Sequence, residues 1–231
     1  MGLIMTPIVL FDIDKTLVAR SRAHLTAFFA ALREVYGVQT EPNVITHHGM
    51  TDQQIIREVL KVKGVHEAAI AAGLSRCMAV MIERFNALIP SDTVELLPGV
   101  IPLLGALLER GMFLGLVTGN LEPIAWGKLA KAGIGRYFSF GGFGSDHIDR
   151  REMAATAIRR CHEKFPLSKG SPITLFGDTP YDIAAGLAIG ARSIGVCTGY
   201  PTREQLQSAG ADVVFDNLAD TQAVLAAILD R

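Results

Sequence analysis

The segment IVLFDIDKTL, residues 8–17, decides the fold of this chain. Its first four residues are apolar and too few for a helix, so they predict a buried strand. Because side chains alternate across a strand, Asp12 and Asp14 would share one face. Two acids this close repel each other and are costly to bury unless a cation neutralises them. Mg²⁺ prefers oxygen ligands and would serve. The alternative is a strand end where both acids turn out into water.

Two later segments also place polar residues directly after short apolar runs. They are the sequence TGN at residues 118–120 and the sequence GDTPYD at residues 177–182. Asp178 and Asp182 lie four residues apart at a predicted strand-to-helix junction. There they can ligate a metal, or they can be a capping acid and a first-turn acid that the helix dipole favours.

From residue 94 onward, apolar runs of strand length alternate with segments of helical periodicity. The predicted strands are 8–11, 113–117, 137–140, 173–176, 193–196 and 212–215, and the glycine-rich segment 141–144 is predicted to be a loop. The predicted core helices are 100–109, 123–131, 151–164, 181–188, 203–209 and 221–229. Such alternation implies an α/β fold, a doubly wound parallel sheet covered by helices on both faces. In these folds ligands bind beyond the carboxyl ends of the strands.

Residues 18–93 carry helical patterns and few strand signals, and they are predicted to form an inserted helical cap. The predicted cap helices are 22–36, 53–62 and 68–88, the last as one helix or two. Residues 1–17 and 94–231 would then build the α/β core. Thr51 or Asp52 can cap the start of the second cap helix.

Composition limits the classes of function. The chain has 231 residues, 49% of them hydrophobic, and a formal net charge of −1 without a basic block. These values fit a well-buried globular protein and argue against nucleic acid or an anionic membrane surface as a partner. The three cysteines are far apart and show neither metal-ligand spacing nor a disulfide framework. With no recognisable signal sequence and no apolar run of membrane length, we expect a cytoplasmic protein.

Taken together, D-x-D-x-T at residues 12–16, TGN at 118–120 and G-D-x-x-x-D at 177–182 resemble, in order, motifs of the haloacid dehalogenase superfamily. That superfamily consists mostly of Mg²⁺-dependent phosphatases and phosphomutases. The resemblance spans nearly the whole chain and implies a Rossmann-like core with a helical cap, as in phosphoglycolate-phosphatase-like hydrolases. The second acid, Asp14, argues for phosphoryl transfer, because hydrolytic dehalogenases of the superfamily lack it.

The resemblance also implies a role for each motif residue. Asp12 would be the nucleophile that forms an aspartyl-phosphate, and Asp14 would be the general acid and base. The implied Mg²⁺ ligands and supports are the Asp12 carboxylate, the Asp14 main-chain carbonyl, Asp178 and Asp182. The implied substrate and phosphate contacts are Thr118, Gly119, Asn120 and, in the cap, Thr51.

The sequence departs from the family pattern at two positions. The family usually places a lysine before the helix that precedes its last motif, whereas this chain has DRRE at residues 149–152. Arginine stays charged and can grip phosphate at two points, so we expect Arg150 to be the catalytic cation, with Arg151 as the alternative. Lys15 stands where the family most often has glycine, and its ammonium would lie either against the phosphate site or in solvent.

The cap segment THHGMTD, residues 46–52, resembles the substrate-facing loop of such caps. His47 and His48 are candidate substrate contacts there, although adjacent histidines are more often surface residues. Because no third ligand is nearby, we do not expect a zinc site.

These observations predict a Mg²⁺-dependent phosphatase that hydrolyses a small phosphorylated metabolite, a phosphomonoester, through an aspartyl-phosphate. A phosphosugar mutase of the same fold is the alternative among enzymes. A catalytically weak phosphate-binding or interaction protein is the alternative from another class, because Lys15 and the missing lysine depart from the pattern. A phosphoacceptor receiver domain also uses acids at strand ends, but it would leave residues 18–93 unexplained.

Overall fold

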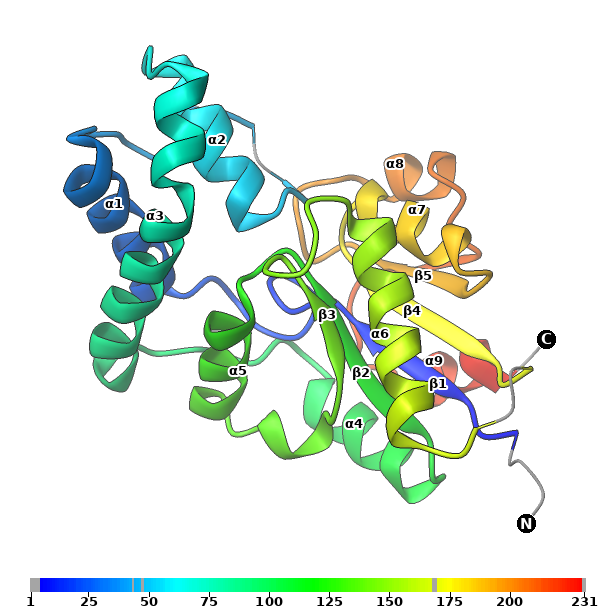
Figure 1. The fold of residues 1–231 in the computed structure, drawn as a ribbon. Coiled ribbons are helices and arrows are strands. Elements are labelled where there is room, and N and C mark those ends of the chain that lie inside the picture. Colours follow the sequence, from blue (N-terminus) through cyan, green and yellow to red (C-terminus); the bar gives the residue numbers. More distant parts are fainter. Residues whose placement is uncertain (1–4, 43, 47, 168–169, 230–231) are drawn as a thin grey trace.

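The computed structural model describes residues 5–42, 44–46, 48–167 and 170–229, and within them six strands form one parallel sheet (Figure 1). The strands are β1 (Ile8–Phe11), β2 (Phe113–Thr118), β3 (Gly141–Phe143), β4 (Ile173–Gly177), β5 (Arg192–Val196) and β6 (Val213–Phe215). Their order across the sheet is β3-β2-β1-β4-β5-β6. This topology confirms the doubly wound α/β fold. Across the described ranges, none of the helices combines the length and the apolar character that a bilayer crossing requires.

Strand β1 lies at the centre because it is apolar on both faces. Its four residues are fully buried and pair with β2 on one side and with β4 on the other. The chain adds β2 and β3 on one side of β1, then crosses over and adds β4, β5 and β6 on the other. The strand order therefore reverses between β1 and β4, and the carboxyl ends of these two strands mark the expected ligand site.

Helices cover both faces of the sheet, and alternate residues of β1 divide between the two resulting cores. Val9 and Phe11 belong to the core that also includes α4 (Val100–Glu109), α5 (Glu122–Lys131) and α9 (Thr221–Leu229). Ile8 and Leu10 belong to the core that also includes α6 (Arg150–Lys164) and α7 (Pro180–Ala188). The short helix α8 (Arg203–Ser208) packs against the far strands, β5 and β6.

Three helices form a cap set apart from the sheet (Figure 1). They are α1 (Arg22–Tyr36), α2 (Asp52–Val62) and α3 (Glu67–Leu88). Their apolar faces share a separate core in which Phe28, Ile56 and Phe85 are buried. Local signals set the helix limits: the Ser21 side chain caps the start of α1, and Gly37, with a φ of 68°, ends that helix.

The chain leaves the sheet for the cap and returns to it at one place. Val18 forms an antiparallel bridge with Leu96, and the N–H of Ala19 donates to the carbonyl of Glu95 at 2.8 Å. Two short adjacent segments therefore connect the cap to the sheet. The predicted limits of the insertion, residues 18 and 93, stay a prediction.

The strand predicted at residues 137–140 is wrong. Residues Gly135–Tyr137 form a 3-10 helix, and the apolar character of the segment comes from Phe138 and Phe140, which are buried. The Ser139 N–H donates to the Leu114 carbonyl at 3.4 Å and the Phe140 carbonyl accepts from the Leu116 N–H at 3.1 Å, just before the observed strand begins. The edge strand is instead Gly141–Phe143, within the segment predicted as a loop. A side chain at Gly142 would place its Cβ 1.9 Å from the Met153 carbonyl oxygen, so glycine here permits α6 to approach the strand.

Candidate active site

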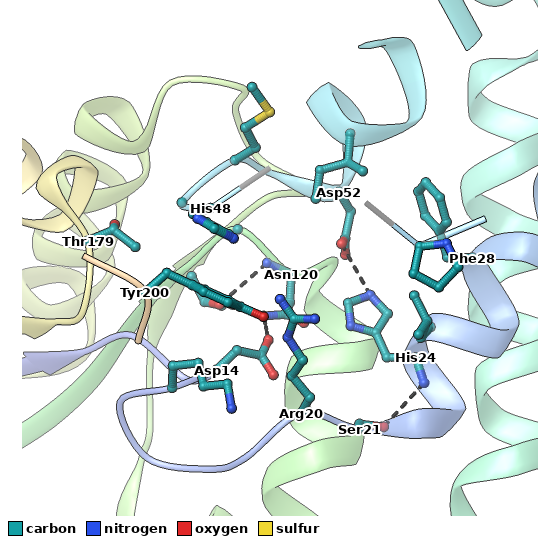
Figure 2. Close-up of a pocket in the computed structure, with 18 of the residues that line it drawn as sticks. Asp14, Arg20, Ser21, His24, Phe28, His48, Asp52, Asn120, Thr179 and Tyr200 are labelled. Carbon is teal, nitrogen blue, oxygen red and sulfur yellow. Dashed lines mark hydrogen bonds and ion pairs between the residues drawn. The ribbon is translucent and has the colours of Figure 1, made fainter. Parts of the chain in front are cut away.

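The carboxyl ends of β1, β2 and β4 border a cavity of about 450 Å³ between the sheet and the cap (Figure 2). Asp12 and Asp14 follow β1, Asn120 follows β2 and Asp178 follows β4, and all four residues line the cavity. Helices α1 and α2 supply the opposite wall. The structure thus brings together strand-end residues that lie more than 160 positions apart in the sequence.

Three buried acids form a cluster on one side of the cavity. Single carboxylate oxygens of Asp12, Asp178 and Asp182 all lie within 4.8 Å of one another. Burial, and then the charges of Asp182 and Asp12, raise the pKa of Asp178 to about 9. Burial also raises the pKa of Asp12 to about 7, although Arg150 acts to lower it. The cluster is therefore short of positive charge, and its oxygen donors are of the kind that a hard divalent cation prefers.

Arg150 is the cation that the structure places at this cluster. Its Nη1 lies 3.3 Å from Oδ1 of Asp12 and also pairs with Asp182. Burial opposes its charge, but these acids raise the pKa of Arg150 further above its already high value. Its Nε is buried and donates to no described residue. The Arg151 side chain, by contrast, is 63% exposed and pairs with Asp149 at the start of α6.

Asp14 is held by a different set of residues. The Nζ of Lys128 lies 2.8 and 2.6 Å from the two oxygens of Asp14 and 2.7 Å from Oδ1 of Asn120. The Asn120 amide donates to Oδ2 of Asp14 at 2.8 Å and to Oγ1 of Thr118 at 2.7 Å. Burial would raise the pKa of Asp14, but the Lys128 ammonium and its hydrogen bonds hold that pKa below its usual value.

Lys128 is a site residue that the sequence prediction missed. Its side chain is 1% exposed, although it stands in the last turn of α5, where a basic residue is ordinarily a solvated partner of the helix dipole. One signal was present in the sequence. Ile124, Ala125, Lys128 and Leu129 share the helical spacing of a buried face, so the lysine stands in an apolar stripe. A lysine in such a stripe needs a buried acid as its partner.

Gly119 and Thr51 lie where the cap touches the core. The carbonyl of Gly119 accepts from the N–H of Asp52 at 2.9 Å, and a Cβ at Gly119 would lie 2.6 Å from the carbonyl oxygen of Met50. The Thr51 hydroxyl accepts a hydrogen bond from the N–H of Gln54 at 3.2 Å, which caps α2. Their predicted contacts with substrate stay predictions.

Asp52 makes a further contact between cap and core that the sequence did not reveal. It is buried, and its Oδ2 accepts from the N–H of Leu121, directly after the TGN segment, at 2.8 Å. Its Oδ1 lies 3.1 Å from Nε2 of His24 on α1. One carboxylate therefore links both cap helices that face the cavity to the loop after β2.

The remaining candidates lie near the mouth of the cavity. The ring of His48 stacks on that of Tyr200 with centroids 3.8 Å apart (Figure 2), whereas His47 lies outside the described residues. Lys15 lines the cavity and has a φ of 65°, the left-handed conformation that favours glycine. Within the described ranges its ammonium forms no ion pair.

Comparison with known proteins places this arrangement in a family. A family model described as haloacid dehalogenase-like hydrolase matches residues 9–196. A protein named probable phosphatase IndB, from Dickeya dadantii, is 26% identical over 230 residues, covering 97% of this chain and 96% of that protein. A phosphoglycolate phosphatase from Escherichia coli O157:H7 is 24% identical over 227 residues, covering 92% of this chain and 89% of that protein.

A solved structure supports the same fold assignment. The crystal structure of a β-phosphoglucomutase from Clostridium difficile matches with a TM-score of 0.76 at 17% identity, covering 97% of each chain. At this identity the likeness concerns the fold alone. It extends over the sheet and the cap together.

Proposed function

The chain belongs to the haloacid dehalogenase-like hydrolase family, and we propose that it is a Mg²⁺-dependent phosphatase that hydrolyses a small phosphomonoester through an aspartyl-phosphate on Asp12. One observation carries the proposal. The first acid of the D-x-D pair is buried between a cation and two further acids, while the second acid is held apart by its own cation. The two carboxylates thus have the separate environments that a nucleophile and an acid–base need.

The residues present suit a magnesium ion. Asp12, Asp178 and the main-chain carbonyl of Asp14 would hold it. The pKa values of Asp12 and Asp178 are raised because the cluster has more carboxyl groups than cations to neutralise them. Asp182 is already engaged by Arg150 and by the Thr179 N–H and hydroxyl, at 3.1 and 2.6 Å, so it would support the ligands. When bound, Mg²⁺ would neutralise these carboxylates and the phosphate oxygens.

Asp12 would then act on the phosphate group. One of its oxygens attacks phosphorus and the bond to the leaving oxygen breaks, which leaves an aspartyl-phosphate. Arg150 lies beside Asp12 and lines the cavity, so its guanidinium is placed to bind the phosphate oxygens. Such charge stabilisation and positioning supply most of the catalysis in phosphoryl transfer.

Asp14 would move the protons of both steps. Because its pKa is lowered, Asp14 is ionised at rest and must take up a proton when substrate binds. It would give that proton to the leaving oxygen in the first step, and in the second it would take one from the water that attacks phosphorus and releases Asp12. Lys128 and Asn120 hold its carboxylate through three hydrogen bonds, which limits the positions that Asp14 adopts. We therefore assign Lys128 as a positioning residue for Asp14.

Release of inorganic phosphate tests this function. The purified chain should release phosphate from a panel of phosphomonoesters with Mg²⁺ and lose that activity in excess chelator. Production of an isomeric sugar phosphate without free phosphate would indicate the mutase alternative. Binding without turnover would indicate the phosphate-binding alternative and would contradict the proposal.

A further inference from the structure

The cavity has two chemically different ends. At the sheet end lie the acids and their cations, whereas the cap end carries a group of apolar side chains. Leu25, Phe28 and Phe29 project from α1 at the i, i+3 and i+4 spacing of one helix face, and Ile55 and Val59 do so from α2 at i and i+4. Figure 2 shows Phe28 on the side of the cavity opposite to Asp14. A group attached to the phosphate and extending toward the cap would lie against this apolar wall.

Several polar side chains near the wall already have partners. His24 pairs with Asp52, and the Ser21 hydroxyl donates to Asp92 at 2.6 Å. The guanidinium of Arg20 lies over the ring of Tyr200, 5.0 Å from its centroid, near the mouth of the cavity. Glu41 also lines the cavity but is exposed to solvent. The side chains of the five wall residues themselves offer no hydrogen bond to a ligand, whereas Lys15, Arg20 and Glu41 keep charged groups elsewhere in the cavity lining.

The wall should favour apolar leaving groups over polar ones, because burial against it strengthens the binding of methylene groups and weakens the binding of hydroxyl groups. Each methylene that moves from water onto an apolar surface improves binding by about fourfold. A hydroxyl buried there without a partner weakens binding by roughly tenfold. The volume of about 450 Å³ also falls in the range of pockets that enclose a whole small molecule. A two-carbon acid would leave much of the wall uncovered, and a sugar would bring unpaired hydroxyls to it.

Resting on the proposed phosphatase function, we propose that the natural substrate is a phosphomonoester whose organic part is apolar, an aliphatic or aromatic group rather than a short carboxylic acid or a polyhydroxylated sugar. The phosphate would lie at Asp12 and Arg150, and the apolar part would lie against Phe28, Phe29 and Ile55. Specificity then arises in the cap, on helices that the described structure places over the site.

A homologous series of substrates tests the proposal on the unmodified enzyme with Mg²⁺. We expect kcat/KM to rise from ethyl to hexyl phosphate by about fourfold per methylene until the cavity is filled. Phenyl phosphate should exceed glucose 6-phosphate, glycerol phosphate and phosphoglycolate by roughly tenfold or more. A flat series, or a preference for phosphoglycolate or a sugar phosphate, would overturn the proposal.

A pair of matched variants locates the effect in the wall. Ile55→Thr changes a lining residue, whereas Ile82→Thr makes the same change in the same cap core outside the cavity. Ile55→Thr should lower kcat/KM for hexyl phosphate by roughly fivefold and leave ethyl phosphate nearly unchanged. Ile82→Thr should preserve the rise along the series, and equal effects of both changes would contradict the assignment of the wall.

The outcomes separate this inference from the function on which it rests. If the enzyme hydrolyses the short esters but shows no apolar preference, the substrate class is wrong and the phosphatase function stands. If no ester in the panel is hydrolysed with Mg²⁺, the phosphatase function fails and the inference fails with it. If circular dichroism shows that Ile55→Thr does not fold, the alkyl phosphate series on the unmodified enzyme still tests the apolar preference.

Discussion

The site contains two buried cation–carboxylate groups on either side of the D-x-D pair, and they differ in their charge balance. On one side Arg150 faces three acids, Asp12, Asp178 and Asp182. On the other side Lys128 binds the single acid Asp14 directly, and Asn120 contacts both residues. The first group therefore lacks positive charge, whereas the second is a closed ion pair.

This difference explains why the same residue type behaves in opposite ways two positions apart. The pKa of Asp12 is raised to about 7 because burial and neighbouring acids outweigh one shared arginine. The pKa of Asp14 is lowered, despite burial, because the Lys128 ammonium and the hydrogen bonds from Lys128 and Asn120 outweigh that burial. The Arg150 side is thus suited to take up a divalent cation and a phosphate, and the Lys128 side is suited to keep one carboxylate in place.

Removing Arg150 should have the largest effect. Arg150→Ala is expected to lower kcat by about 10³-fold or more, because it deletes the cation beside the nucleophile and the phosphate. Arg151→Ala is the matched control, since that side chain is exposed and pairs only with Asp149 among described acids, and it should keep most activity. Steady-state kinetics on folded variants checks both. The opposite pattern would transfer the role to Arg151.

Removing Lys128 should have a smaller effect that depends on the leaving group. Lys128→Met is expected to lower kcat by about 10²-fold for an alkyl phosphate, within the range for disturbing a general acid–base. The loss should be smaller for p-nitrophenyl phosphate, whose leaving group needs little protonation. Lys131→Met changes an exposed lysine of the same helix and should be silent. Equal losses on both substrates would contradict a positioning role through Asp14.

The two groups could be predicted from the sequence to different degrees. Arg150 was predictable because the acids at strand ends demand a cation, and the motif order indicates the helix that supplies it. Lys128 was not predicted because its position in the last turn of α5 is also the ordinary place of a solvated basic residue. Only the packing of α5 against the sheet shows that this residue faces inward.

The fold shows a similar limit. Strands with continuous apolar runs, such as β1 and β4, were predicted within a residue of their observed limits. The edge strand β3 was not, because Gly142 is required by the close approach of α6 and glycine has a low strand propensity. The local sequence pattern predicts strands whose own residues are apolar. It fails for a strand whose residue types are set by contact with a neighbouring helix.

The charge deficit of the Arg150 group should appear in the stability of the metal-free protein. The folded-state pKa values of Asp12 and Asp178, about 7 and about 9, exceed the ordinary value of 3.8. Between about pH 4 and pH 9 the folded state therefore binds more protons than the unfolded state. The stability that these two carboxyl groups contribute is fully present below about pH 4 and is lost as the pH rises toward 9. We expect the metal-free Tm to fall between pH 5 and pH 8, and Mg²⁺ to reduce that fall.

A matched pair of variants assigns this fall to the cluster. Asp178→Asn removes the carboxyl group with the larger shift and should diminish the fall in Tm, while Asp216→Asn, at an exposed acid, should not. An unchanged fall in the Asp178 variant would show that the pH dependence arises elsewhere.

Changing Lys15, the residue that follows Asp14 and lines the cavity, should have the smallest effect. Its φ of 65° strains a lysine but not a glycine. Lys15→Gly is therefore expected to raise the free energy of unfolding by about 0.5 kcal/mol, after the entropy that glycine loses on folding. Lys63→Gly, at a φ of −82°, should instead lower it. Thermal melts check the signs, and destabilisation by Lys15→Gly would indicate a contact of the Lys15 side chain.

The central claim is that Asp12 carries the phosphoryl group while Asp14 transfers protons, and trapping the phosphoenzyme tests it most directly. Asp14→Asn should slow hydrolysis of the intermediate, so this variant with p-nitrophenyl phosphate and Mg²⁺ should give a burst of p-nitrophenol. Acid quench, borohydride reduction and peptide mass spectrometry should then show homoserine at position 12, and not in Asp12→Asn. A phosphorylated residue elsewhere, or turnover without any trapped intermediate, would contradict the account.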